Sequence, residues 1–301
     1  MIRPVAIGPV AHAAVGRARG EGRVLARLGA STYLTVGGEI VWLGGAGATL
    51  HPRAILTEGT PGPDDDDVHI ELGALSPWRP APAPGGGARS GLLTGWRDLA
   101  VATPGTPVGF GALLAGRPLA FPLDGVRGAA EALADACARD DPARAADAAL
   151  ALLGVGGGLT PSGDDYVGGA LFVRAVIGAD DRAAGWRRVG RTVVAAARTR
   201  THPISAALLA DLAAGSSWAP LHDLVAALDR GRPAAARAAA GRLLALGHSS
   251  GWDMLAGVGA GLGALAGCRH RSCSGVREGE PCTRPSESIA PAIARPSATS
   301  A

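Results

Sequence analysis

The sequence of 301 residues contains no lysine, no asparagine and no glutamine. Without lysine, the chain can neither form a Schiff base with a carbonyl substrate nor build a Walker A phosphate loop. Its fixed positive charge comes from arginine alone, whose planar guanidinium suits carboxylates and phosphates. The formal net charge is only +3, so no excess of charge indicates a nucleic-acid partner or a membrane surface.

Cysteine and long apolar runs are also scarce. The chain has 4 cysteines, most of them after residue 267, at spacings that match no common zinc signature. A disulfide framework is not expected in a chain this long, which favours a reducing compartment. The N-terminal residues resemble a signal peptide only faintly, because Pro9 and His12 interrupt the apolar run. The segment 251–267 is too short and too glycine-rich for a membrane span, so we expect a cytoplasmic protein with no membrane partner.

Hydrophobic residues make up 47% of the chain, enough for a substantial core. Residues 1–125 contain β-branched and aromatic stretches broken by glycine pairs such as Gly37-Gly38, which favours strands and hairpins. Residues 126–267 are rich in Ala and Leu, with a break near 140–142, which favours helices. Residues 268–301 have little to bury and predict a disordered tail. The sequence predicts an α+β fold, with a mostly-β domain followed by an all-helical one.

Some segments can be assigned in more detail. Residues 91–105 resume a strand-like character after a Pro/Gly-rich piece. In the second domain, Ala- and Leu-rich patches predict helices at 165–178, 181–199, 204–214, 219–229, 232–246 and 251–267.

The stretch GVGGGLTPSGDDYVGG, residues 154–169, gathers glycines around an acidic pair between two helical segments. It is not a phosphate loop, because lysine is absent, nor a dinucleotide fingerprint, because the preceding segment is helical. A capping aspartate alone would not need so many glycines. Free N–H groups at such a helix start favour an anion, whereas two carboxylates favour a cation such as Mg²⁺ or complement the helix dipole. The candidate residues are Gly158, Thr160, Ser162, Gly163, Asp164 and Asp165.

Two later segments have a similar character. In LGHSSGWDMLAG, a helix start brings together His248, Ser249, Ser250 and Asp253. The pattern Gly-x-Ser-x-Gly there also matches the elbow of α/β-hydrolases, but that elbow needs a strand before the serine, and the preceding segment is helical. In ARTRTHPISAALL, arginines precede another helix start, which makes an anion site plausible. Its candidate residues are Arg198, Arg200, Thr201 and Ser205.

Together and in this order, the three segments resemble the family of the AllH subunit of bacterial oxamate carbamoyltransferase. GGGLTPSGDDYVGG is similar to the family's GLTPSGDD signature, THPISAALL to its Thr-rich cap before a Leu-rich helix, and LGHSSGWDMLAG to its Gly-His-Ser-Ser-Gly segment. The strong similarity spans about 154–263. His202-Pro203 departs from the small polar residues of the family pattern.

The resemblance implies a subunit of an enzyme of allantoin (purine) nitrogen catabolism that transfers a carbamoyl group between oxalurate and phosphate, giving oxamate and carbamoyl phosphate. Its partners would be an AllF-like (FdrA-type) subunit and an AllG-like subunit. In that chemistry, backbone N–H groups near 157–163 and 247–251 could serve as oxyanion donors, and Arg198 or Arg200 could clamp a carboxylate. Asp164, Asp165 and His248 are the candidate catalytic residues. Asp164 and Asp165 would orient the substrate amide or hold Mg²⁺.

Two other functions stay open. Because the sequence offers no complete set of nucleophile, base and acid, the chain could be a non-catalytic subunit that binds a metabolite or docks its partners. It could also be a stand-alone hydrolase of small amides that uses Ser249 as nucleophile.

Overall fold

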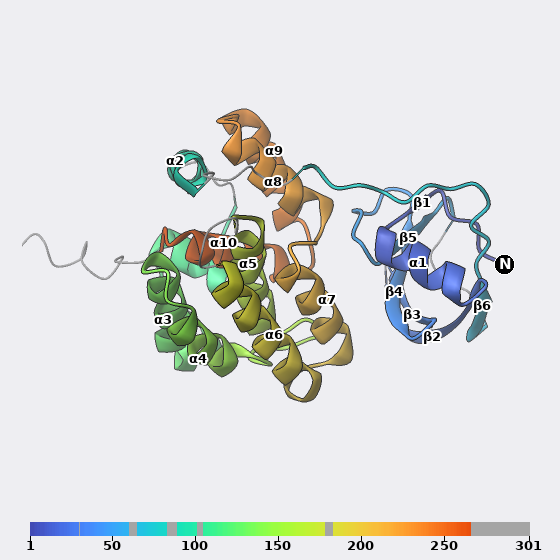
Figure 1. Ribbon diagram of the computed structural model, residues 1–301, viewed down its shortest axis with the longest axis horizontal. Helices are drawn as coiled ribbons and strands as arrows, with labels where there is room; N and C mark the ends of the chain where they lie inside the picture. The colour runs from blue at the N-terminus through green and yellow to red at the C-terminus, as the bar shows by residue number, and fades with distance from the viewer. Residues whose placement is uncertain (30, 60–64, 83–88, 101–104, 178–182, 266–301) are drawn as a thin grey trace, which may run out of the picture. The chain divides into compact units, whose positions relative to one another are not determined.

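The computed structural model describes residues 1–29, 31–59, 65–82, 89–100, 105–177 and 183–265. The predicted tail, 268–301, lies outside these residues. The predicted α+β class is confirmed: a sheet near the N-terminus is followed by a region made mostly of helices (Figure 1). The predicted domain boundary at residue 125 stays a prediction.

The sheet has six strands in the order β1-β5-β4-β3-β2-β6. Strands β4 and β5 pair in parallel, and the other neighbouring strands of the described sheet are antiparallel. The predicted hairpin is confirmed, because Val36 pairs with Glu39 across Gly37 and Gly38, whose φ angles of 55° and 82° suit glycine. The strands are β1 (Ala6–Ile7), β2 (Glu21–Leu28), β3 (Ser31–Val36), β4 (Glu39–Gly45), β5 (Ala54–Thr57) and β6 (Asp67–His69).

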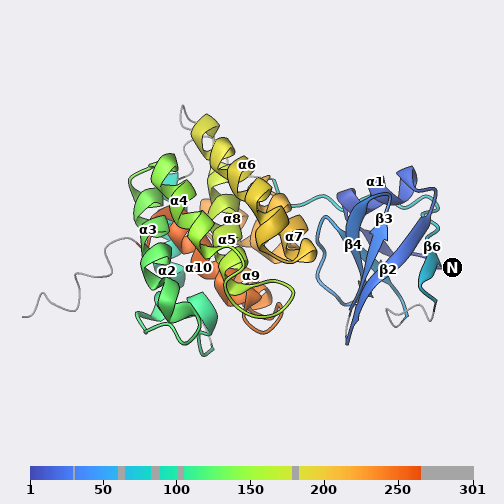
Figure 2. The same cartoon turned by 90° about the horizontal axis from the view of Figure 1, so that it is seen from below.

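Helix α1 (Pro9–Arg17) covers one face of this sheet (Figure 2). Its residues Ala11, Ala14 and Val15 are buried against apolar side chains of the strands, such as Leu34 and Val41. The i, i+3, i+4 spacing of the helix residues is that of an amphipathic helix. The sheet region therefore has a core of its own.

One segment that was predicted to be strand-like is helical. Residues 91–100, interpreted as strand-like, lie in helix α2, so that interpretation was wrong there. Leu92, Trp96 and Leu99 are all buried, and their spacing of four and three residues places them on one helix face. The helices are α2 (Arg89–Ala100), α3 (Arg127–Ala138), α4 (Pro142–Leu152), α5 (Ser162–Ile177), α6 (Ala183–Arg200), α7 (Pro203–Ala213), α8 (Ala219–Asp229), α9 (Pro233–Leu244) and α10 (Ser250–Leu262), with 3₁₀ turns η1 (Gly109–Ala115) and η2 (Leu123–Val126).

The predicted break between α3 and α4 is confirmed, and the carboxylate of Asp141 caps α4 by accepting a hydrogen bond from the Arg144 N–H. In the described part of the chain, no helix is long and apolar enough to cross a membrane.

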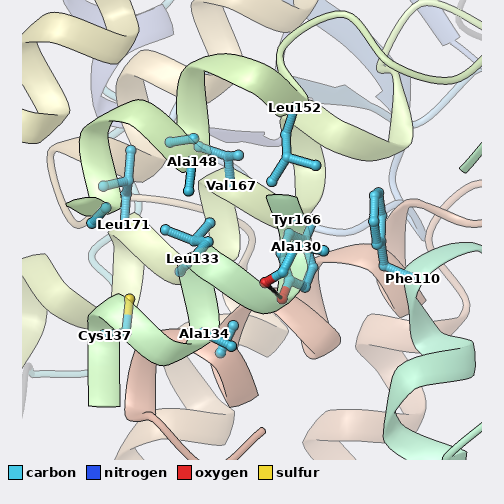
Figure 3. Packing of buried hydrophobic residues seen from close by; sticks show 14 of the residues in the cluster. Phe110, Ala130, Leu133, Ala134, Cys137, Ala148, Leu152, Tyr166, Val167 and Leu171 are labelled. Carbon is cyan, nitrogen blue, oxygen red and sulfur yellow. Dashed lines mark hydrogen bonds between the residues drawn. The ribbon is translucent and has the colours of Figure 1, made fainter. Parts of the chain in front are cut away.

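Helices α5 and α10 lie side by side at the centre of the helical region (Figures 1 and 2). Nearly every residue of both is buried. Around α5, Tyr166 stacks on Phe110 with ring centroids 4.6 Å apart, and its hydroxyl donates to the Ala130 carbonyl of α3 (Figure 3). Because the buried Tyr166 hydroxyl has a hydrogen-bond partner in α3, it fixes α5 against α3.

Contacts also join the sheet to the helices. The guanidinium of Arg53 forms two hydrogen bonds with the carboxylate of Asp211 in α7, at 2.6 and 2.9 Å. Both side chains are buried. Burying two unpaired charges would destabilise the folded protein, and the two hydrogen bonds of this pair compensate for that cost.

Candidate functional site

The GLTPSGDD segment forms the first turn of α5. The helix begins at Ser162, three residues before the predicted start at 165, because the N–H groups of Asp164 and Asp165 both donate to the Pro161 carbonyl, at 2.9 and 3.2 Å. Both carboxylates therefore lie in the first turn, where negative charge offsets the helix dipole.

Asp164 is tied to two other segments of the chain. Its Oδ1 accepts a hydrogen bond of 2.8 Å from the Gly154 N–H. Its Oδ2 accepts one from the Ser205 hydroxyl, at 2.6 Å, and another from the Thr201 hydroxyl. The carboxylate thus joins the glycine-rich lead-in to the start of α7.

The other candidate residues near α7 contact other parts of the chain. His202 caps the helix, since its Nδ1 accepts the Ile204 N–H at 3.2 Å. Arg200 donates to the Leu150 carbonyl at 2.9 Å, near the end of α4. Arg198 is exposed and lines a groove of about 490 Å³ between α6 and α7, together with Arg187 and Arg191. The structure therefore brings Thr201 and Ser205, but not the two arginine side chains, to Asp164.

The LGHSSGWD segment meets the start of α5 from the other side. The hydroxyls of Thr160 and Ser250 lie 3.1 Å apart, and those of Ser162 and Ser249 lie 3.3 Å apart. Ser249 occupies the N-cap position of α10 without making a side-chain cap bond. All three motif segments thus converge on the start of α5.

Asp253, in the first turn of α10, is fully buried, and its Oδ1 accepts a 2.6 Å hydrogen bond from the Phe110 N–H of η1. Burial raises its pKa to about 6, although the Phe110 N–H and the Ser162 and Ser249 hydroxyls oppose the shift. A carboxyl with such a pKa can hold or release a proton near neutral pH.

Asp165 has a pKa raised well above its ordinary value, first by burial and then by the charges of Asp253 and Asp164. Hydrogen bonds from the Ser250 and Thr160 hydroxyls partly oppose this rise. Among the described residues, Oδ2 of Asp165 and Oδ2 of Asp253 are buried and accept no hydrogen bond. A buried acceptor without a donor is costly, so such an atom is more often found where something binds.

The adjacent aspartates therefore face different partners. Asp164 accepts hydrogen bonds from the loop and from α7, whereas the pKa of Asp165 responds to Asp253 and Ser250 of α10. Over the described ranges, no three His, Cys, Asp or Glu side chains form a metal-ligand group. Mg²⁺ bound by Asp164 and Asp165 stays a proposal, and Asp253 supplies the second carboxylate on the side of Asp165.

Exposed residues surround the hydroxyls. Gly157, Gly158, Gly247 and His248 are exposed, while Thr160, Ser249 and Ser250 are half-buried. Helix α9, not a strand, precedes Ser249, as the sequence suggested. The geometry thus lacks the strand that a hydrolase elbow requires.

Sequence reasoning missed two groups of the site. The N–H groups of Phe110 and Gly154 hold Asp253 and Asp164, and a backbone donor has no side-chain signature. The sequence also suggested that Asp165 acts together with its neighbour Asp164, whereas in the structure the charge of Asp253 acts more strongly on Asp165. A signal for this pairing exists in the sequence, because both helix starts contain Ser-Gly-x-Asp.

Comparison with known families agrees with this convergence. No characterised relative and no solved structure matches the chain. The region from the end of α4 to the end of α10, which contains all three motifs, does match a family. Over residues 152–262, the chain carries the sequence pattern of the oxamate carbamoyltransferase subunit AllH.

Proposed function

We propose that this chain is the AllH-type subunit of a carbamoyltransferase complex of allantoin catabolism, and that the paired starts of α5 and α10 bind the substrate. The complex would convert oxalurate and phosphate into oxamate and carbamoyl phosphate, together with AllF-like and AllG-like subunits. The observation that carries the proposal is the buried pair Asp165 and Asp253 beneath four hydroxyls, inside the segment that matches the family.

The residues suit the bond changes of this reaction. A phosphate oxygen attacks the carbamoyl carbon of oxalurate, the bond from that carbon to the oxamate nitrogen breaks, and the nitrogen gains a proton. A carboxyl with a raised pKa, such as that of Asp253, can supply the proton. Hydroxyls of Ser249, Ser250 and Thr160 and the N–H groups of the exposed glycine turns can donate to the negative charge that develops on oxygen.

Mg²⁺ is usually held by one or two carboxylates together with substrate phosphates. The carboxylates predicted to hold it are Asp164 and Asp165. Both oxygens of Asp164 already accept hydrogen bonds from the protein, so Mg²⁺ at this place would have to displace the donor of Gly154, Thr201 or Ser205.

The test is the activity of the reconstituted complex. Asp253→Asn should lower carbamoyl phosphate formation from oxalurate and phosphate by at least about a hundredfold, within the range of lost general-acid catalysis. Asp147→Asn, at an exposed position of α4, is the matched control and should keep full activity. A wild-type complex that does not form carbamoyl phosphate would show that the proposal is wrong.

One observation favours a second candidate, a subunit that binds metabolite or assembles the complex without performing chemistry. Among the described contacts, Ser249 meets the Ser162 hydroxyl and the Asp253 carboxyl rather than a histidine base. Calorimetry of the isolated chain with carbamoyl phosphate, phosphate and oxamate would reveal such binding. Turnover by the chain alone would exclude this candidate. Slow oxalurate hydrolysis that disappears in Ser249→Ala would instead support the hydrolase.

A further inference from the structure

The two helix starts repeat one sequence pattern. Residues 162–169 read SGDDYVGG and residues 250–257 read SGWDMLAG, so both contain Ser-Gly-x-Asp-x-x-x-Gly. In this alignment Asp165 corresponds to Asp253. Position 164, an aspartate in the first copy, is a tryptophan in the second.

Each copy of the pattern contacts the other copy, and the two contacts involve equivalent positions. A Cβ on Gly169 would lie 2.3 Å from the Met254 carbonyl oxygen, and a Cβ on Gly257 would lie 2.1 Å from the Tyr166 carbonyl oxygen. Tyr166 and Met254 hold the same place in the pattern, so the two contacts are equivalent. Gly257 lies against Tyr166 and Gly261 lies against Ala170 and Val173, so the numbers rise together along both helices. The helices are therefore parallel and their N-termini share one end.

The preceding helices repeat as well. Helices α3 and α4 pack together, as do α8 and α9 (Figure 1). Each pair is joined through a residue with a left-handed φ two positions before a proline: Asp140, with φ 55°, and Gly231, with φ 59°. Gly163 then approaches the Leu152 carbonyl of α4, and Gly251 approaches the Leu243 carbonyl of α9. Helices α3–α4–α5 and α8–α9–α10 thus share these junction features, and each group of three helices is termed a unit.

The same relation extends to the carboxyl groups. The Ser250 hydroxyl lowers the pKa of Asp165, and the equivalent Ser162 hydroxyl lowers the pKa of Asp253. Each carboxyl keeps its Oδ2 buried and without a hydrogen-bond donor in the described part of the chain. The pair is therefore a feature of the junction between the two units.

We propose that Asp165 and Asp253 act as one site between the two units and that this site binds the primary amide of the substrate, the –CO–NH₂ group. The inference rests on the proposed function and names the part of the substrate that the pair recognises.

A primary amide fits this pair for a chemical reason. The two buried Oδ2 atoms that lack a protein donor are two acceptors, which match the two N–H groups of a primary amide, and the nearby hydroxyls of Thr160, Ser249 and Ser250 can donate to its C=O. A second carboxylate in that place would offer only acceptors and would be repelled. Asp164 adds negative charge nearby, and Tyr33 on β3, whose pKa is raised by burial and by Asp165, adds a neutral hydroxyl.

The segments that carry the hydroxyls reach solvent. The half-buried hydroxyls of Thr160, Ser249 and Ser250 belong to loops whose residues Gly157, Gly158 and His248 are exposed. A small ligand would replace the contacts between these hydroxyls with contacts to itself.

Titration calorimetry of the full chain with two small probes tests the inference. Oxamate and oxalate differ only in that oxamate has an amide where oxalate has a second carboxylate. Oxamate should bind at least about tenfold more tightly, the difference that one lost hydrogen bond to a charged group gives. Equal binding, tighter binding of oxalate, or binding of neither probe would overturn the inference.

Three variants separate an amide site from a cation site. An asparagine keeps a side-chain oxygen as acceptor while the other member stays a carboxylate, so Asp165→Asn and Asp253→Asn should each keep oxamate affinity within about threefold. The double variant has no carboxylate acceptor and should lose at least about tenfold. If either single variant abolishes oxamate binding, or if oxamate binds only with added Mg²⁺, the amide site is wrong. The complex could still form carbamoyl phosphate in that case, so the proposed function is judged separately.

Discussion

The starts of α5 and α10 share one pattern but are anchored by opposite means. At α5, the residue before the shared aspartate is Asp164, held by the Gly154 N–H and by hydroxyls of α7. At α10, the equivalent residue is Trp252, which is buried against Gly111 and Gly105 near η1. One copy is fixed by polar bonds and the other by apolar packing. The position between glycine and the shared aspartate is thus an anchor, and the shared aspartates are left for another role.

The largest expected effect is the loss of the polar anchor. Asp164→Ala leaves three donors without their acceptor in a buried place, and each such loss costs about 1–3 kcal/mol. We expect about 5 kcal/mol lower free energy of unfolding, measured by urea denaturation. Asp147→Ala, at an exposed site, should stay within about 0.5 kcal/mol of wild type. A small effect of Asp164→Ala would mean that α5 is not held through this carboxylate.

The apolar anchor comes next. Trp252→Ala removes a large side chain that is 7% exposed, and such truncations cost about 3–5 kcal/mol. The lower part of that range is expected, because the loops bearing Gly105 and Gly111 can close on the space. Trp252→Phe should recover about half of the loss in the same urea measurement. If Trp252→Ala unfolds at the same urea concentration as the wild type, packing of Trp252 does not anchor α10 in the way that Asp164 anchors α5.

The close contact between the helices gives a smaller effect. In Gly257→Ala the new methyl group would meet the Tyr166 carbonyl at 2.1 Å, so α5 and α10 must separate, at about 2–3 kcal/mol. Gly241→Ala in α9 is the matched control, because a methyl group there would have open space for 4 Å around it. That change should be neutral or stabilising by up to about 1 kcal/mol, since alanine is the better helix former. Thermal unfolding of both variants decides whether the helices touch as closely as described.

The smallest effect depends on pH. The pKa of Asp253 is about 6 in the folded protein and close to 4 when unfolded, so the folded state binds more protons between these values. Stability attributable to this group therefore falls as pH rises from about 4 to above 6, and stays low beyond.

Asp253→Asn removes this dependence, because it keeps the neutral form at every pH. The variant should gain on the order of 1–2 kcal/mol over wild type at pH 8, and the gain should shrink toward pH 4. Unfolding curves at pH 4, 6 and 8 measure it. A gain that is greatest at pH 4 would contradict the raised pKa.

The sequence was informative where local chemistry decides the structure. Alanine and leucine predicted most helices, and the break before Pro142 and the turn at Gly37-Gly38 follow from backbone preferences of single residues. The prediction for 91–100 was wrong because it relied on the general composition of the segment and not on the helical spacing of Leu92, Trp96 and Leu99.

The candidate site was predictable as a set of segments but not as a geometry. Neighbouring residues on a helix point about 100° apart, so Asp164 and Asp165 could not share all their partners. The pairing of Asp165 with Asp253 depends on the packing of α5 against α10, which no local propensity encodes. Only the repeated Ser-Gly-x-Asp pattern hinted at it.

The buried pair of Arg53 and Asp211 has a practical consequence for protein production. Helix α7 carries Ser205 in its first turn, bonded to Asp164, and Asp211 further along, bonded to Arg53. If the helical region were expressed without the sheet, Asp211 would lose its counter-charge and the same helix that supports the site would begin to loosen. A truncated protein should therefore carry Asp211→Leu, which replaces an abandoned charge with an apolar surface.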